Sequence, residues 1–253
     1  MQQPRVTIAY VPREVFSQKR ESLQAVLSNT AEPFDLVCVD GASPPELQTW
    51  LEGMAMDHEF TLLRSDRYLT PNQARNIALE YVKTPYVAFV DNDVLPSKGW
   101  LKALLDCAEE TGAWAVGPLY CEHLPLESKI HMAGGLCRFH TDNRGDRWYE
   151  EKHHLQHQPL AGNEDKLHRQ ETELIEFHTV LVSMAAFEQL GPLDECLLNH
   201  SEHADFSLSI RKAGGTVYLE PASRITYVPP RRLSDEDRPF FELRWSEAWS
   251  RSS

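Results

Sequence analysis

The sequence predicts an α/β fold with a mostly parallel central sheet and helices on both of its faces. The first half alternates short apolar segments with segments of helical spacing, and this rhythm is typical of β-α-β units, whose strands run parallel. Two of the apolar segments end in carboxylates, at Asp40 and at Asp91. Parallel strands bring their carboxyl ends to one edge of a sheet, so we expect these acidic groups at the edge where such sheets bind ligands.

The individual elements follow from apolar periodicity and from residues that start or stop a helix. Leu23, Val26 and Leu27 have the spacing of one helix face, and Pro71 suits the first turn of a later helix. Short apolar runs bounded by turn residues predict the strands. The expected strands are 6–11, 34–39, 60–64, 87–90, 177–182 and 216–219. The expected helices are 17–27, 71–82, 97–111, 184–190 and 202–213.

The chain is expected to form one domain over 1–233 with a C-terminal helix after it. Within the domain, 121–175 is polar, holds most of the eleven histidines and has no clear period, which indicates a long excursion or lid with a short hairpin. Over 234–253, aromatic residues recur at every fourth position. This stripe predicts an amphipathic helix that packs on the domain or on a second copy of the chain, as in a homo-oligomer.

The composition is that of an ordinary globular protein with an acidic surface. The 253 residues are 42% hydrophobic, enough for a sizeable core, and a net charge of −13 argues against nucleic acid as the main partner. The five cysteines form no Cys-x-x-Cys motif, and the apolar surroundings of Cys38 and Cys107 predict reduced, buried thiols. Without a signal-like N-terminus or a membrane-spanning apolar run, the chain is expected to be soluble and cytoplasmic.

The stretch Asp91-Asn92-Asp93 directly follows the apolar run over 87–90 and carries the most chemical information. Two carboxylates one residue apart at a strand end offer hard oxygen ligands, which suit Mg²⁺ or Mn²⁺, and such an ion would suit a diphosphate. A solvated turn is the alternative, since Asp and Asn are common turn residues. The sequence therefore predicts a candidate metal site at this edge of the sheet.

An ordered set of short motifs runs through most of the chain. The set comprises Asp40, Ala74-Arg75-Asn76, Asp91-Asn92-Asp93, Gly191-Pro192-Leu193-Asp194-Glu195, Glu202-His203-Ala204-Asp205 and Arg211-Lys212-Ala213-Gly214-Gly215. In this order, the set resembles the family 2 glycosyltransferases, which have the GT-A fold with a Rossmann-like sheet. The resemblance covers about 6–218, with the excursion over 121–175 unmatched. It implies an inverting glycosyltransferase, of the hexosyltransferase type, that moves a sugar from a nucleotide sugar to a saccharide or glycan acceptor.

The resemblance also implies roles for the residues at the sheet edge. Asp40 would contact the base of the nucleotide, as a hydrogen-bond acceptor for the uracil of a UDP-sugar, and Arg75 would lie near the diphosphate. Asp93 would be the more direct ligand of a Mn²⁺ or Mg²⁺ ion. Asp91 would contact the ribose or the metal and its water, and Asn92 between them is a further candidate for nucleotide contact. The unmatched excursion would then lie on the acceptor side.

The catalytic base falls among three residues at the start of the helix over 202–213. Glu202 and Asp205 are three positions apart, so they share a face near the positive end of that helix. Family members commonly carry Glu-Asp-x-Asp here, and the second position is often assigned as the base that deprotonates the acceptor hydroxyl. This chain has His203 at that position. Glu202 is the favoured base, followed by Asp205 and then His203, because a neutral histidine can also serve as a base.

A second departure from the family pattern concerns the metal. Many relatives carry a metal-binding histidine just after the last core strand, where 221–227 contains none. His178 or His200 could substitute for it. Alternatively, two carboxylates with water and phosphate oxygens could satisfy the ion.

Other histidines and aromatic residues allow several interpretations. Four histidines of the excursion fit no strong zinc signature and come without cysteines, so a solvated polar loop is expected there. They are His153, His154, His157 and His168. Trp100, Trp148 and Tyr149 are candidates for stacking on a sugar or for packing in a core or an interface.

Two further functions are alternatives to catalysis of glycosyl transfer. A catalytically inactive, nucleotide-binding or scaffolding subunit of the same fold would agree with the two departures from the family pattern. A sugar nucleotidyltransferase would use a related sheet and a divalent metal, but it calls for a glycine-rich, basic loop after the first strand. The segment 12–16 contains no glycine, which argues against that function.

Overall fold

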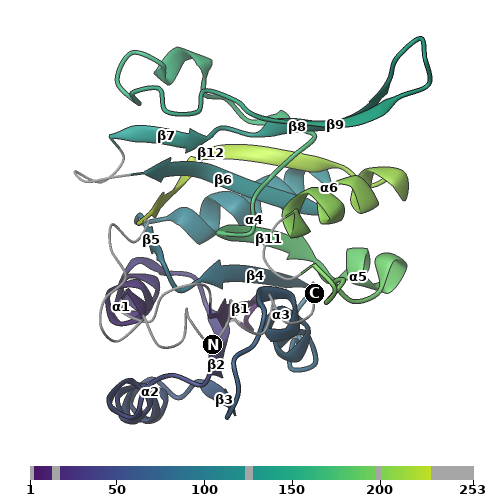
Figure 1. Cartoon of the computed structure of the whole chain (residues 1–253). Helices are drawn as coiled ribbons and strands as arrows, with labels where there is room; N and C mark the ends of the chain where they lie inside the picture. The colour runs from purple at the N-terminus through teal and green to yellow at the C-terminus, as the bar shows by residue number, and fades with distance from the viewer. Residues whose placement is uncertain (1–2, 13–17, 123–127, 198–200, 229–253) are drawn as a thin grey trace.

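A computed structural model describes residues 3–12, 18–122, 128–197 and 201–228 (Figure 1). Its main sheet has the strand order β10-β12-β6-β11-β4-β1-β2-β3, with β5 beside β12 and β7 beside β6. The parallel part contains β1 (Val6–Val11), β2 (Phe34–Gly41), β3 (Thr61–Ser65) and β4 (Tyr86–Asp91). These four strands confirm the parallel arrangement that the first half of the sequence predicts.

The second part of the sheet has mixed strand directions. Strand β11 (Thr179–Ser183) is antiparallel to both of its neighbours, β4 and β6. Beyond it, β6 (Ala115–Glu122) and β12 (Val217–Tyr227) run parallel to each other. Shorter strands complete the sheet, namely β5 (Val94–Pro96), β7 (Lys129–Met132) and β10 (Gln170–Glu171). The antiparallel β11 therefore joins the two parallel groups of strands.

Helices cover both faces of the sheet, as predicted. One face carries α1 (Lys19–Asn29), α2 (Pro45–Asp57) and α4 (Trp100–Thr111), and their apolar residues share a core with β1, β2 and β4. The opposite face carries α3 (Pro71–Leu79), α5 (Met184–Leu190) and α6 (Glu202–Lys212). Helix α3 begins with a capping box, because Thr70 and Gln73 each accept a hydrogen bond from the other's backbone N–H.

The excursion over 121–175 is more regular than the sequence predicts. It contains β7, a hairpin of β8 (Gly135–Thr141) and β9 (Arg147–His153), a short 3₁₀ helix η1 (Glu164–Lys166) and β10. The far end of the hairpin projects from the body of the molecule (Figure 1). Trp148 and Tyr149 lie on β9 with half and about a third of their surface exposed, and Trp148 stacks on His140. The strands of the hairpin are polar, and their side chains are largely solvated. They therefore lack the apolar alternation from which a strand is predicted.

Besides the short strands β5, β7 and β10 and the 3₁₀ helix η1, three longer elements were not expected from the sequence, or not at their full length. Helix α2 buries two residues, Leu47 and Leu51. Two buried positions give a weak apolar periodicity, so the sequence did not predict this helix. Strand β6 is buried along its whole length despite Gly117 and Pro118, which are more typical of turns. Strand β12 continues to Tyr227, well past the predicted end at 219.

Several sequence-based expectations about the core can be resolved. Trp100 is fully buried, and its indole N–H donates to the hydroxyl of Thr30 at 2.9 Å, so it is a core residue and not a sugar platform. The expected reduced thiols are confirmed for Cys38 and Cys107, which are free and buried.

Candidate metal centre

Asp91 and Asp93 lie where the buried strand β4 turns into β5. The neighbouring strand β11 runs antiparallel to β4, with Thr179 opposite Val90. This register places His178 beside Asp91, whose backbone N–H donates to the carbonyl of His178 at 3.0 Å. The sheet thus brings His178 to the two aspartates from far along the chain. His178 was one of the two histidines that the sequence analysis named as possible substitutes for the missing one.

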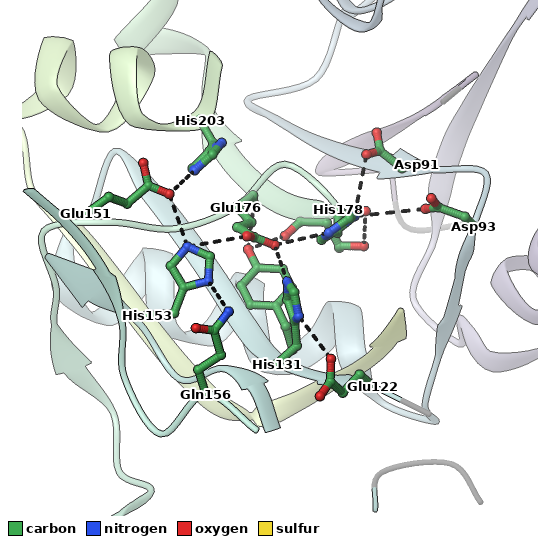
Figure 2. Close-up of polar contacts among 12 residues, drawn as sticks. Asp91, Asp93, Glu122, His131, Glu151, His153, Gln156, Glu176, His178 and His203 are labelled. Carbon is green, nitrogen blue, oxygen red and sulfur yellow. Dashed lines mark hydrogen bonds and ion pairs between the residues drawn. The ribbon is translucent and has the colours of Figure 1, made fainter. Parts of the chain in front are cut away.

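The three side chains form a compact set of buried metal-ligand atoms. Nδ1 of His178 lies 3.8 Å from Oδ2 of Asp91 and 3.9 Å from Oδ1 of Asp93 (Figure 2). One ligand atom from each residue lies within 4.8 Å of the other two. Nδ1 of His178 is buried and has no hydrogen-bond partner among the described residues. A buried nitrogen that faces two carboxylates without a hydrogen bond fits a divalent cation between the three groups.

Glu176 and Tyr227 hold the imidazole of His178 in this orientation. Oε2 of Glu176 lies 3.1 Å from Nε2 of His178, which leaves Nδ1 directed at the aspartates. Burial alone would raise the pKa of Glu176, but the charges and hydrogen bonds of His178 and His131 hold it well below the usual range. The ring of Tyr227 stacks on His178 with 4.2 Å between centroids. Tyr227, in the segment 221–227, thus packs against the histidine that is the candidate ligand.

Arg75, fully buried on α3, contacts the first aspartate of the candidate metal centre. Its guanidinium donates to Oδ1 of Asp91 at 2.8 Å and to Oδ1 of Asn72 at 3.1 Å. It also sits 4.2 Å above the ring of Phe177. These contacts give Arg75 a role in holding Asp91, while its contact with a diphosphate stays a prediction. Asn92, between the aspartates, is fully buried as well.

Asp40, the candidate for base recognition, is almost fully buried at the end of β2. Lys19, also fully buried, donates to its Oδ1 at 2.7 Å, and the Ser43 hydroxyl and the Arg64 guanidinium bond to the same carboxylate. Burial alone would raise the pKa of Asp40, but Lys19, Ser43 and Arg64 lower it below the usual range. The carboxylate is therefore held ionised by its neighbours, and its contact with a nucleotide base stays a prediction.

Replacing Lys19 with methionine should destabilise the fold by about 3 kcal/mol at pH 7, because the buried carboxylate of Asp40 loses its buried cation. The folded pKa of Asp40 lies below the unfolded value, so its contribution is complete above about pH 4 and is lost as the pH falls through the folded pKa. The deficit should therefore shrink in acid. Urea unfolding at neutral and acidic pH measures it, with exposed Lys98→Met as the control. Equal deficits at both pH values would contradict the assignment.

The three candidate bases occupy different environments at the start of α6. Glu202 is buried, whereas Asp205 is exposed. Partial burial and the charge of Asp194 raise the pKa of Asp205. Nε2 of His203 lies 3.0 Å from Oε1 of Glu151. Burial alone would lower the pKa of His203, but the hydrogen bond to Glu151 and the nearby carboxylates raise it.

The expectation of a solvated histidine loop is wrong for His153. Its side chain is 12% exposed, and it belongs to a chain of polar contacts that links His203, through Glu151 and Glu176, to His178 (Figure 2). Three residues in this set of polar contacts were not singled out from the sequence. They come from the excursion and from the segment after it. They are His131, Glu151 and Glu176. The alternation of Glu151 and His153 along one strand was the available signal, since alternate residues of a strand face the same side.

Some sequence-based expectations concern residues outside the described parts of the chain. His200, the other possible substitute for the missing histidine, is one of these, and so is the C-terminal helix expected over 234–253. Within the described ranges, none of the helices combines the length and the apolar character that crossing a bilayer requires.

Comparisons with known proteins bear on the family and the fold. The family model described as glycosyl transferase family 2 matches residues 19–171, more than half of the chain. No curated protein matches the sequence. A solved structure, "Crystal structure of GalNAc-T7 with UDP, GalNAc and Mn2+", superposes with a TM-score of 0.66 at 17% identity. The match covers 96% of this chain and 48% of that one, so the chain spans about half the length of that protein. The likeness confirms the predicted GT-A fold.

Proposed function

The chain belongs to glycosyl transferase family 2, and we propose that it moves a sugar from a UDP-sugar to a hydroxyl of a saccharide or glycan acceptor. The reaction is proposed to depend on a metal and to invert the anomeric carbon. The observation that carries the proposal is the buried group of Asp91, Asp93 and His178 at the carboxyl edge of β4. Ligand sites in open α/β sheets lie at such an edge. A cytoplasmic location is part of the same proposal.

Asp91, Asp93 and His178 would hold the cation. Mg²⁺ prefers oxygen ligands alone, so a set with one imidazole nitrogen favours Mn²⁺ over Mg²⁺. When bound, the ion would neutralise the charge that develops on the leaving diphosphate. The solved structure of similar fold is that of GalNAc-T7 with UDP, GalNAc and Mn²⁺, which supports the choice of nucleotide and ion.

Two residues that contact the proposed ligands have a positioning role. Arg75 fixes Asp91 through a charge-assisted hydrogen bond and offsets its buried charge. Glu176 fixes the ring of His178 from the far side. A rigid ligand set of this kind needs little reorganisation when the donor binds, which is how preorganised sites lower the barrier to reaction.

Glu202 is the proposed base that takes the proton of the acceptor hydroxyl as its oxygen attacks the anomeric carbon. A single displacement of this kind needs one carboxylate near the acceptor, and it inverts the centre. Glu202 is buried in the first turn of α6, whose N-terminal dipole favours a negative charge. Asp205 is exposed and faces the charge of Asp194, and His203 is engaged by Glu151, so both are less suited to this role.

Substitution of Glu202 by glutamine should lower kcat by a factor on the order of 10² to 10⁴, the usual worth of a general base, and leave donor binding unchanged. Transfer kinetics and nucleotide binding measure the two effects. Glu188→Gln, at an exposed glutamate of α5, is the matched control and should behave as wild type. A larger loss for Asp205→Asn than for Glu202→Gln would assign the base to Asp205.

A thermal-shift panel tests the donor proposal directly. UDP, GDP, dTDP and CMP would each be added with and without Mn²⁺, because a ligand that binds only the folded protein raises its unfolding temperature. We expect a Mn²⁺-dependent shift with UDP. A shift with another nucleotide would change the donor class, and no shift with any nucleotide would overturn the proposal. A UDP shift without sugar transfer would favour the inactive, nucleotide-binding subunit.

A further inference from the structure

A second group of metal-ligand atoms lies where the β8–β9 hairpin meets the start of α6. Nε2 of His153 and Nε2 of His203 lie 3.2 and 3.0 Å from the same oxygen, Oε1 of Glu151 (Figure 2). The ligand atoms of these three residues all lie within 4.8 Å of one another. Two residues come from β9 and the third from α6, more than forty positions later in the sequence.

We propose that Glu151, His153 and His203 form a second cation site, which binds a divalent transition-metal ion of the Zn²⁺ class. Two imidazoles with one carboxylate are a ligand set that Zn²⁺ takes in proteins, with the fourth position left to water or a substrate. A set with two imidazoles favours Zn²⁺ and its neighbours, because they bind nitrogen ligands more tightly than Mn²⁺ does.

The exposure of the three side chains fits an ion with an open position. The exposed fractions of the side chains are 26% for Glu151, 12% for His153 and 18% for His203. The side chains of Asp91 and Asp93 are almost fully buried. A partly exposed group gives an ion a route of entry and leaves room for a further ligand.

Gln156 supports a metal-binding orientation of His153. The carboxamide of Gln156 lies 3.5 Å from Nδ1 of His153. With its oxygen and nitrogen exchanged by a half-turn, the carboxamide would accept a hydrogen bond from Nδ1–H and leave Nε2 for the ion, which is the usual arrangement of a metal-bound imidazole.

The second site shares no ligand with the metal centre of Asp91, Asp93 and His178. Oε1 of Glu176 lies 3.6 Å from Nε2 of His153, while its Oε2 contacts His178, so Glu176 stands between the two sites. His131 and His153 form another group with Glu176. We assign the ion to Glu151 and His203 because Glu176 already orients His178 and is buried with it.

Zinc stoichiometry of the full chain tests the assignment. The chelator-stripped protein would be titrated with Zn²⁺ against a chromophoric competitor, and with Co²⁺ as a spectroscopic probe. Wild type should bind two ions per chain. His153→Ala and the nearly isosteric Glu151→Gln should each lose one equivalent of bound Zn²⁺ and the Co²⁺ absorption of that site. Both variants should keep the Mn²⁺-dependent thermal shift with UDP. Asp93→Asn should lose the other equivalent and keep the Co²⁺ signal of the His153 site.

His140→Ala is the matched control, because His140 also lies on the hairpin and pairs with a glutamate, Glu150, at 2.6 Å. It should bind two ions. Metal-free unfolding temperatures of all variants establish that each one folds. Retention of both equivalents by His153→Ala and Glu151→Gln would overturn the proposal. A loss in His131→Ala without a loss in His203→Ala would overturn the assigned ligands, since it would place the ion beside Glu176.

Discussion

Asp93→Asn should reduce the rate of sugar transfer on the order of 10²- to 10³-fold, the loss seen when one preorganised group that stabilises transition-state charge is removed. Asparagine has nearly the same shape as aspartate, but it lacks the charge that would hold the cation against the leaving diphosphate. The free protein should not lose stability, because the substitution removes one of two buried carboxylates that lie close together. The change should therefore appear in catalysis and not in folding.

Initial rates over a range of Mn²⁺ concentrations measure the effect of Asp93→Asn, with urea unfolding as the stability readout. If Asp93 is a ligand, higher Mn²⁺ should restore part of the activity, because weaker binding is offset by mass action. Asp57→Asn, at an exposed aspartate of α2, is the matched control and should leave both rate and stability unchanged. Wild-type rates in Asp93→Asn at every Mn²⁺ concentration would show that Asp93 does not bind the ion.

Arg75→Met should destabilise the protein by about 3–5 kcal/mol, the cost of breaking a buried ion pair by removing one partner. Arg75 and Asp91 are both fully buried, and their ion pair has a distance of 2.8 Å. Methionine fills much of the space on Phe177 but leaves the Asp91 charge buried without its cation. Arg75→Lys should also lose stability, because an ammonium cannot reach Asp91 and Asn72 with the fixed geometry of a guanidinium.

A double substitution separates the charge effect from loss of packing. Adding Asp91→Asn to Arg75→Met should recover part of the lost stability, since the buried charge is then gone as well. Arg20→Met is the matched control: Arg20 is an exposed arginine that lies 5.1 Å above the ring of Trp50, and its loss should cost less than about 1 kcal/mol. Equal losses for Arg75→Met and Arg20→Met, measured by urea unfolding, would contradict the role given to the Arg75–Asp91 pair.

The parallel part of the sheet was predictable because its information is local. Each strand there is a short apolar run, and Asp40 and Asp91 mark the ends of two of them. The position of His178 beside the aspartates follows from the antiparallel pairing of β11 with β4. That pairing is not visible in the local sequence. No periodicity distinguishes an antiparallel from a parallel buried strand, so His178 could be named as a candidate but not placed.

The histidines of the excursion illustrate the same limit. Glu151 and His153 alternate along one strand, but His203 belongs to a different element, so spacing along the chain does not show that His203 joins them. A search for zinc signatures fails here, because such signatures describe ligands that are close in sequence. Similarly, Lys19 and Asp40 are 21 residues apart, and their buried pair becomes visible only when α1 packs beside β2.

The position of β11 also determines when, during synthesis, the three side chains of the candidate site can come together. During synthesis, Asp91 and Asp93 leave the ribosome some 85 residues before His178, and β11, which begins directly after His178, pairs with β4 beside them. A nascent chain that ends before His178 holds both carboxylates but not the imidazole that faces them. The three candidate ligands therefore come together only once the chain through β11 has been made and β11 lies between β4 and β6.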